Sequence, residues 1–246
     1  MMPREWIVPD WPAPERVRAF ATTRHGGVSE GPYGSFNLRA SGSDKPEHVA
    51  RNREILRENL PEMPHWLVQK HTVDVVRWQA ERHPESAVAD GAVTSVPGRV
   101  CSVLTGDCMQ LLLCNDEGTQ VGAVHAGWRG MAAGVLENGV RALGVDPKSV
   151  MAWMGPTIGQ DAFEVGPEVL EAFRAGHPDA PEAFRPGKPG KLHADLYRLA
   201  RQRLALAGVT RVYGGGYCTY TETGRFFSYR REKESGRMGS FIWIGR

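Results

Sequence analysis

VCSVLTGDCMQLLLCNDEGTQVGAVHAGWRG, residues 100–130, contains the signals around which the rest of the chain is arranged. Two apolar runs, residues 109–114 and 119–124, flank the polar turn NDEG, a pattern typical of a β-hairpin. A strand before this hairpin and a helix that starts after HAGWRG are also predicted. The stretch therefore indicates a mixed α/β domain.

The register of this hairpin brings two reactive side chains together. If Asn115 lies opposite Gly118, the pairing continues along the strands until Cys108 faces His125. Directly opposed residues of antiparallel strands have Cβ atoms about 4.5–5.5 Å apart. We therefore expect a thiol beside an imidazole, close enough to share a proton or a metal ion.

The composition is that of a folded globular protein. Of 246 residues, 41% are hydrophobic and 24% charged, which excludes a disordered tail or a fibrous repeat. The formal net charge is +2 and the basic residues are scattered, so a nucleic-acid partner is not expected. With no apolar run of ~20 residues and no signal-peptide pattern, we expect a cytoplasmic protein without a membrane segment.

The cysteines also suit a cytoplasmic protein. Four are present, without the close C-x-x-C spacing of many metal or redox motifs, which favours reduced thiols over a disulfide framework. Free cysteines are most often small core residues. We expect this role for Cys101, Cys114 and Cys218, whereas the polar TGD before Cys108 and the facing histidine single that thiol out.

The rest of the chain alternates predicted strands and helices in one domain over residues 1–246, with mixed strand directions. Residues 65–79 predict two strands, or one bent strand, with His71 at the bend. Helix 46–59 has Asp44 available as a cap. Strands are expected over residues 17–22, 89–98 and 150–154, from 209–216 and over 241–244, and helices over 46–59, 130–145, 167–174 and 192–207, with a loop over 177–191.

Two backbone segments are candidates for ligand binding. Residues 22–38, TTRHGGVSEGPYGSFNL, combine glycines with donor side chains and are able to cradle an anionic or hydroxyl-rich ligand, with a plain surface loop as an equal alternative. The helix that follows His125 directs its first N–H groups toward the same place, where an anion is favoured.

Cys108 and His125 permit two chemistries. In a Cys-His hydrolase the sulfur attacks a carbonyl and the imidazole relays the proton. In a zinc enzyme both side chains bind the metal, and a third protein ligand leaves one position open. His71 is the best third ligand, although a lone histidine at a strand bend is more often structural.

Copper is a less favoured metal. A cysteine and two histidines, with Met109 nearby as a soft axial ligand, resemble some copper sites. However, the eight histidines include no His-x-His pair, and Met109 should point to the face opposite Cys108. A multicopper polyphenol oxidase is therefore not expected.

Taken together, several motifs identify a family. The chain resembles the YfiH family, also called the laccase-domain or multicopper polyphenol oxidase family, over nearly its whole length. The matching motifs, in order, are TTRHGGVS, FNL, VQKH, DGAVT, TGDC, AVHAGWRG, GPTIG with FEVG, CT, and FFSYRR with GRMG.

The resemblance implies both a fold and an activity. It implies one α/β domain of layered sheets flanked by helices, similar to cysteine hydrolase-like toxins, with zinc bound at the catalytic residues His71, Cys108 and His125. It also implies a purine nucleoside enzyme that phosphorolyses inosine, guanosine, adenosine and methylthioadenosine and deaminates adenosine. Some members are implicated in editing peptidoglycan precursors, which implies an amidase.

The chain departs from the usual family pattern near the expected site. Gly106 stands where alanine is common before Asp-Cys, Gln110 where proline is common, and RASGSD over residues 39–44 replaces a more Gly-Val-rich segment. None of these changes removes an expected metal ligand. The changes at positions 106 and 110 flank the expected site and would alter its shape.

The leading hypothesis is a cytoplasmic zinc enzyme that acts on purine nucleosides and phosphate. Arg24, Asn37 and Arg230 are the candidates for phosphate or ribose contacts. A metal-free Cys-His amidase and a non-catalytic nucleoside-binding protein are the alternatives. The partner in each case is a small molecule, and the oligomeric state is left open.

Overall fold

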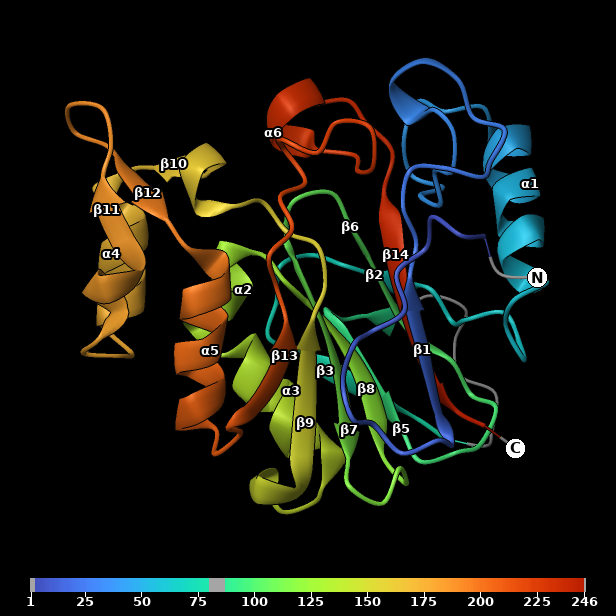
Figure 1. Cartoon of the computed structure of the whole chain (residues 1–246), viewed down its shortest axis with the longest axis horizontal. Helices are drawn as coiled ribbons and strands as arrows, with labels where there is room; N and C mark the ends of the chain where they lie inside the picture. The colour runs from blue at the N-terminus through green and yellow to red at the C-terminus, as the bar shows by residue number, and fades with distance from the viewer. Residues whose placement is uncertain (1–2, 80–86, 246) are drawn as a thin grey trace.

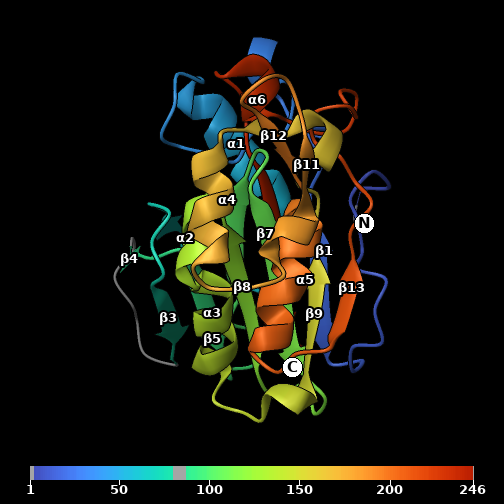
Figure 2. The same cartoon turned by 90° about the vertical axis from the view of Figure 1, so that its left-hand side faces the viewer.

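The computed structural model describes residues 3–79 and 87–245, which form four stacked layers (Figure 1, Figure 2). A six-stranded sheet and a three-stranded sheet lie face to face. Helices cover the outer face of the larger sheet, and one helix covers the outer face of the smaller sheet. This arrangement confirms the predicted class of layered sheets flanked by helices.

The elements follow the chain as follows. The helices are α1 (Pro46–Arg57), α2 (Trp128–Ala133), α3 (Val135–Leu143), α4 (Pro167–Arg174), α5 (Leu196–Leu206) and α6 (Tyr229–Glu232). The strands are β1 (Val17–Ala21), β2 (Leu67–Val68), β3 (Val75–Trp78), β4 (Ala87–Val88), β5 (Gly91–Thr94), β6 (Cys101–Thr105), β7 (Met109–Asn115), β8 (Val121–Ala126), β9 (Val150–Met154), β10 (Glu164–Val165), β11 (Phe184–Pro186), β12 (Leu192–Ala194), β13 (Arg211–Gly214) and β14 (Met238–Ile244).

The predicted hairpin lies in the middle of the larger sheet, whose order is β13-β9-β7-β8-β5-β3. Every residue of β7 and β8 is buried, because helices cover one face and the sheet β1-β14-β6 covers the other. A strand without a solvent-facing side is apolar along its whole length. Val124 contacts the helices and Ala123 the smaller sheet, so His125 shares the inter-sheet face of Ala123.

The expected register of this hairpin is wrong by two residues. His125 pairs with Gln110 rather than with Cys108. The loop is longer than NDEG because the side-chain oxygen of Asn115 accepts hydrogen bonds from the backbone N–H groups of Thr119 and Gln120, both at 2.9 Å. A shift of two residues keeps each side chain on the same face. Cys108 therefore still lies on the side of His125, displaced along the strand.

Local interactions change three other expected elements. The helix expected over residues 130–145 is two helices, because Gly134 adopts a left-handed backbone with φ of 103°. The helix expected over 192–207 begins only at Leu196, where Asp195 caps it, and residues 192–194 form β12. The expected loop over 177–191 contains β11. Asp44 does not cap α1; its carboxylate accepts from Ser29 and Asn37 instead.

Other predictions are confirmed. Residues 65–79 contain two strands, β2 and β3, with His71 in the bend between them. Cys101 and Cys114 are buried core residues, as expected, whereas Cys218 is only half-buried. None of the described helices is long and apolar enough to cross a membrane.

A buried polar contact joins the two sheets close to His125. Gln110 in β7 accepts a hydrogen bond from the hydroxyl of Ser240 in β14 and donates one to the backbone oxygen of Pro156 at 2.8 Å. Both side chains are fully buried. A buried amide that lost these partners would be costly, so the contact holds the two sheets in one relative position at this level.

The break between α2 and α3 gives a test of the fold. Gly134→Ala should lower the free energy of unfolding by roughly 1–2 kcal/mol, because a Cβ disfavours the left-handed conformation. The added Cβ meets only ordinary contacts, so crowding does not contribute. Gly224→Ala, at a position with open space, is the matched control, and chemical denaturation measures both. An equal effect of the two changes would contradict the assignment.

Candidate functional site

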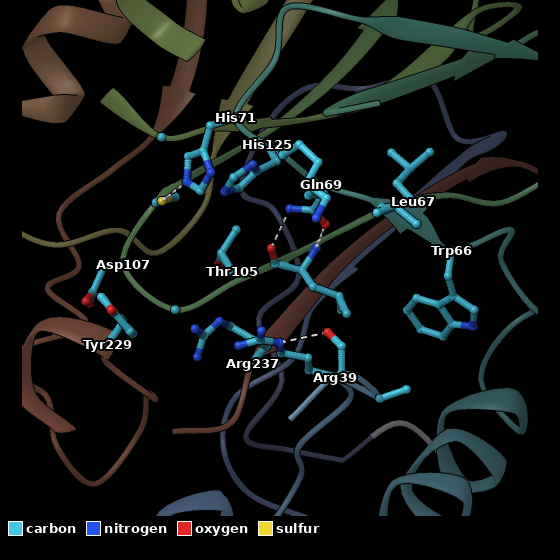
Figure 3. Close-up of a pocket in the computed structure, with 18 of the residues that line it drawn as sticks. Arg39, Trp66, Leu67, Gln69, His71, Thr105, Asp107, His125, Tyr229 and Arg237 are labelled. Atoms are coloured by element: carbon cyan, nitrogen blue, oxygen red, sulfur yellow. Dashed lines mark hydrogen bonds between the residues drawn. The ribbon is translucent and has the colours of Figure 1, made fainter. Parts of the chain in front are cut away.

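Three potential metal ligands meet at one end of the gap between the two sheets (Figure 3). His71 comes from the bend between β2 and β3, Cys108 from the bend between β6 and β7, and His125 from β8. Their ligand atoms all lie within 4.8 Å of one another, and Cys108 Sγ lies 3.7 Å from His71 Nε2. The structure thus brings together all three residues of the predicted trio, which is able to hold a metal ion.

A buried carboxylate orients two of these ligands from behind. Asp90 Oδ1 accepts a hydrogen bond from His125 Nδ1 at 2.7 Å, which leaves Nε2 to face the other two ligands. Asp90 Oδ2 accepts from the backbone N–H groups of Lys70 (3.1 Å) and Thr72 (2.6 Å), the residues on either side of His71. A carboxylate behind a histidine fixes its tautomer and ring orientation in metal sites.

The backbone at the site is held in unusual conformations. His71 has a φ of 59° and Asp107, just before Cys108, a φ of 114°, both uncommon for residues other than glycine. The Asp107 carboxylate is fixed by Thr219 Oγ1 at 2.5 Å and by the backbone N–H of Arg230 at 2.6 Å. Backbone strain of this kind persists where surrounding contacts impose it, and it concentrates at functional sites.

The pKa values of Cys108, His125 and Asp90 are shifted, and His125 interacts with both of the other groups. Burial opposes ionisation of Cys108, but the charge and hydrogen bond of His125, with His71, lower the thiol pKa to about 6. Burial also opposes the charge on His125, but Cys108 and Asp90 raise its pKa to about 9. Burial would raise the pKa of Asp90, but hydrogen bonds from His125 and the Thr72 backbone lower it to about 2. Without a metal, the site therefore favours a thiolate next to an imidazolium.

Gly127 gives the trio its compactness. A Cβ at this position would lie 2.3 Å from His71 Cδ2 and 3.2 Å from Cys108 Sγ. Any side chain here would displace a ligand, so position 127 in the HAGW turn requires glycine.

The trio opens into a cavity of about 1380 Å³ with a basic lining. Trp66 and Leu67 form an apolar wall, and Gln69 is tied by two hydrogen bonds to the backbone of Leu104 (Figure 3). Asp107 is the one carboxylate among the described lining residues. The cations of the lining are Arg39, Arg53, Lys70, Arg129, Arg230 and Arg237.

Of the three residues expected to contact phosphate or ribose, the structure brings only Arg230 to the cavity. Arg24 lies outside the cavity lining; it donates to Gly34 O and Thr223 O, both at 2.9 Å. Asn37 is also outside the lining and is buried, with 1% of its surface exposed. Its amide bonds to backbone and to Asp44.

Sequence reasoning missed several residues of the site. Asp90 stands in DGAVT immediately before β5, and its backbone oxygen accepts from His125 N at 2.7 Å. The signal in the sequence is an acidic residue directly before a strand, β5, that pairs with β8, the strand of His125. Arg237 stands in GRMG, where the motif was noted without a role. Nothing in the local pattern around Arg39 marks it as a cavity residue.

The chain is similar to known proteins over nearly its whole length. A family model described as multi-copper polyphenol oxidoreductase laccase matches residues 18–245. The chain belongs to this laccase-domain family. Laccase-domain relatives include the purine nucleoside phosphorylase YfiH of Escherichia coli, 51% identical over 241 residues that cover 97% of this chain and 98% of the relative. A purine nucleoside phosphorylase of Pseudomonas aeruginosa is also 51% identical, with the same coverage.

Solved structures of laccase-domain proteins share the whole fold. The protein NMB0706 of Neisseria meningitidis is 44% identical and has a TM-score of 0.93, over 99% of this chain and 100% of that one. YlmD of Geobacillus stearothermophilus is 29% identical and has a TM-score of 0.92, over 100% and 98% of the two chains. The four-layer arrangement is therefore that of the family.

The role of Asp90 can be tested on metal affinity. Asp90→Asn should weaken metal binding roughly 10- to 100-fold, because the amide no longer supplies the charge that fixes and polarises His125. Asp74→Asn, a change of the same kind at an exposed neighbour, is the control. Competition with a chromophoric chelator measures both affinities. Unchanged affinity in Asp90→Asn would show that the carboxylate has no part in metal binding.

Proposed function

We propose that this protein is a zinc-dependent purine nucleoside enzyme whose catalytic metal ligands are His71, Cys108 and His125. Its main reaction is phosphorolysis of inosine, guanosine, adenosine and methylthioadenosine, with deamination of adenosine at the same site. The observation that carries the proposal is the compact trio opening into a basic cavity. The names of the relatives from Escherichia coli and Pseudomonas aeruginosa support the choice of substrate.

The donor set and its spacing fit zinc. Tetrahedral zinc with Zn–S of about 2.3 Å and Zn–N of about 2.05 Å places sulfur and nitrogen about 3.6 Å apart, and Cys108 Sγ lies 3.7 Å from His71 Nε2. The lowered thiol pKa supplies the thiolate that zinc prefers. One cysteine and two histidines leave a fourth position for a reacting group, as in catalytic zinc sites.

The surroundings favour zinc over copper. Met109, the soft ligand that a copper site would recruit, is fully buried on the helix-facing side with Leu111 and Val124. His125 lies on the other face of the sheet. In residues 3–79 and 87–245, the His–Cys–His trio is the one group of three or more potential ligands, whereas a multicopper oxidase needs more.

The cavity residues divide the work of phosphorolysis. An oxygen of hydrogen phosphate bonds to ribose C1′, the C1′–N9 bond breaks, and the purine leaves as the neutral base with the proton that the phosphate gives up. Zinc held by the trio would supply a Lewis acid next to the reacting groups. The basic lining attracts the phosphate dianion, and Trp66 with Leu67 offers the purine ring an apolar wall.

A second candidate function rests on the acid–base pair. A thiolate at Cys108 beside a protonated His125 oriented by Asp90 is the arrangement of a Cys-His nucleophile. In a metal-free amidase, the sulfur would attack an amide carbonyl of a peptidoglycan precursor, and His125 would protonate the leaving nitrogen. A non-catalytic nucleoside-binding protein would use the same cavity.

The metal ligands give the direct test. The purified protein should carry about one zinc per chain, and His71→Ala, Cys108→Ala and His125→Ala should each remove zinc and reduce inosine phosphorolysis to near background. His25→Ala, an exposed histidine outside this cavity, is the control. Elemental analysis measures the metal, and chromatographic detection of hypoxanthine measures turnover. Wild-type protein without stoichiometric zinc would contradict the proposal.

Chelation separates the candidate functions. Removal of the metal should abolish inosine phosphorolysis, and added zinc should restore it, because the metal takes part in the reaction. A Cys-His amidase would keep its activity under chelation and form a thioester at Cys108, visible as a mass increase. Inosine binding with no product from inosine, phosphate or adenosine would indicate a binding protein.

A further inference from the structure

We propose that Arg39 and Arg237 form a phosphate subsite on the cavity wall opposite His71 and His125. The proposal rests on the phosphorylase function above and assigns the groups that hold its second substrate. Figure 3 shows the two arginines close together, across the cavity from His71 and His125.

The charge of the cavity calls for an anion. Among the residues that the structure describes, six basic side chains line it, against the single carboxylate of Asp107. That carboxylate is already bonded to Thr219, Ser228 and the backbone of Arg230. Within the described chain, no carboxylate lies within ion-pair distance of any of the six. A protein of net charge +2 has thus concentrated unpaired positive charge at one place.

Of the six basic side chains, Arg39 and Arg237 lie close enough together to bind one anion between them. Burial lowers the pKa of Arg237 and the positive charge of Arg39 lowers it further, while the negative charges of Cys108 and Asp107 offset only part of this effect. Two like charges brought together and partly removed from water are unfavourable without a counterion. A phosphate dianion between them would neutralise both.

The hydrogen bonds of the two side chains leave their outer edges available. Arg237 Nη1 donates to the backbone oxygens of Ser235 (2.8 Å) and Gly236 (2.9 Å), which anchors the guanidinium and leaves its Nε–Nη2 edge without an acceptor among the described residues. Arg39 donates from Nε to Ser41 Oγ at 3.1 Å, and its Nη1 and Nη2 also have no acceptor among the described residues. An anchored guanidinium with a free two-nitrogen edge suits bidentate phosphate binding.

A buried amide fixes the spacing of the pair. Asn37 Oδ1 accepts hydrogen bonds from the backbone N–H groups of both Arg39 and Arg237, each at 3.0 Å. The two residues are 198 positions apart in the chain (237 − 39), yet one oxygen atom joins their backbones. Such an arrangement fixes the backbone positions from which both side chains extend before a ligand arrives.

Direct binding tests the subsite without catalysis. Inorganic phosphate is titrated by calorimetry into the zinc-loaded wild type, Arg39→Gln, Arg237→Gln and the control Arg51→Gln, an exposed arginine on α1. Each cavity variant should bind phosphate about 10- to 100-fold more weakly, because it loses charge-assisted hydrogen bonds. Arg51→Gln should match the wild type. Equal affinity in all four proteins, or no phosphate binding by the wild type, would overturn the subsite.

Steady-state kinetics gives a second readout. In Arg39→Gln and Arg237→Gln, the KM for phosphate should rise by at least about 10-fold while the KM for inosine changes less than about twofold. Parallel changes in both constants would indicate general damage to the cavity and refute the assignment. If the wild type binds phosphate through these arginines but does not turn over inosine, the proposed function fails and the subsite stands.

A phosphate group reaches this cavity either as the free ion or on a nucleotide. Competition with inosine and with inosine 5′-monophosphate distinguishes the two. For a free-phosphate subsite, inosine and phosphate bind together, and the nucleotide binds no more tightly than inosine. Nucleotide binding at least about 10-fold tighter, and dependent on Arg39 and Arg237, would assign the arginines to a nucleotide phosphate and overturn the role of co-substrate subsite.

Discussion

The candidate site depends on the carboxylate of Asp90. One of its oxygens holds the ring of His125, and the other holds the backbone on both sides of His71. Two ligands that are distant in sequence are therefore positioned by a single buried charge. That charge is itself stabilised by the donors around it, so its pKa is held at about 2. Without Asp90, no single side chain would hold both the bend that carries His71 and the strand that carries His125.

The position of Asp90 follows from sheet topology. It directly precedes β5, which pairs with β8 so that Gly91 lies opposite Val124. The next pair along the ladder brings Asp90 to His125. His125 is thus placed by strand pairing, whereas Cys108 and His71 come from bends next to strands, His71 with a left-handed backbone.

The trio itself was predictable from the sequence, although the register was not. The alternation of side chains put Cys108 and His125 on one face, and that inference survives a shift of two residues. The side chain of Asn115 determines the shift by bonding to the loop backbone, and the sequence pattern NDEG does not show this. In the same way, apolar periodicity predicted one helix where the conformation of Gly134 makes two.

The positions of Arg39 and Arg237 in the cavity lining could not be predicted, because they depend on contacts between segments that are distant in the sequence. Asn37 and Arg24 are polar side chains of a glycine-rich loop, which predicts ligand contacts, but both bond to the backbone of the protein instead. Asn37 instead joins the backbones of Arg39 and Arg237, whose side chains reach the cavity. A sequence shows which side chains can donate hydrogen bonds. It does not show which of them face a cavity, because that depends on the course of the loop in the folded protein.

The contact between Gln110 and Ser240 affects the distance between the metal-ligand side and the arginine side of the cavity. His125 lies in β8 of the larger sheet and Cys108 directly precedes β7 of that sheet, whereas Arg237 directly precedes β14 of the smaller one. The two sides of the cavity therefore belong to separate layers, and sliding of one layer over the other would change the gap between them. The hydrogen bond between Gln110 and Ser240 opposes such sliding, so a buried polar pair outside the cavity lining helps to set the distance between the two sides of the cavity.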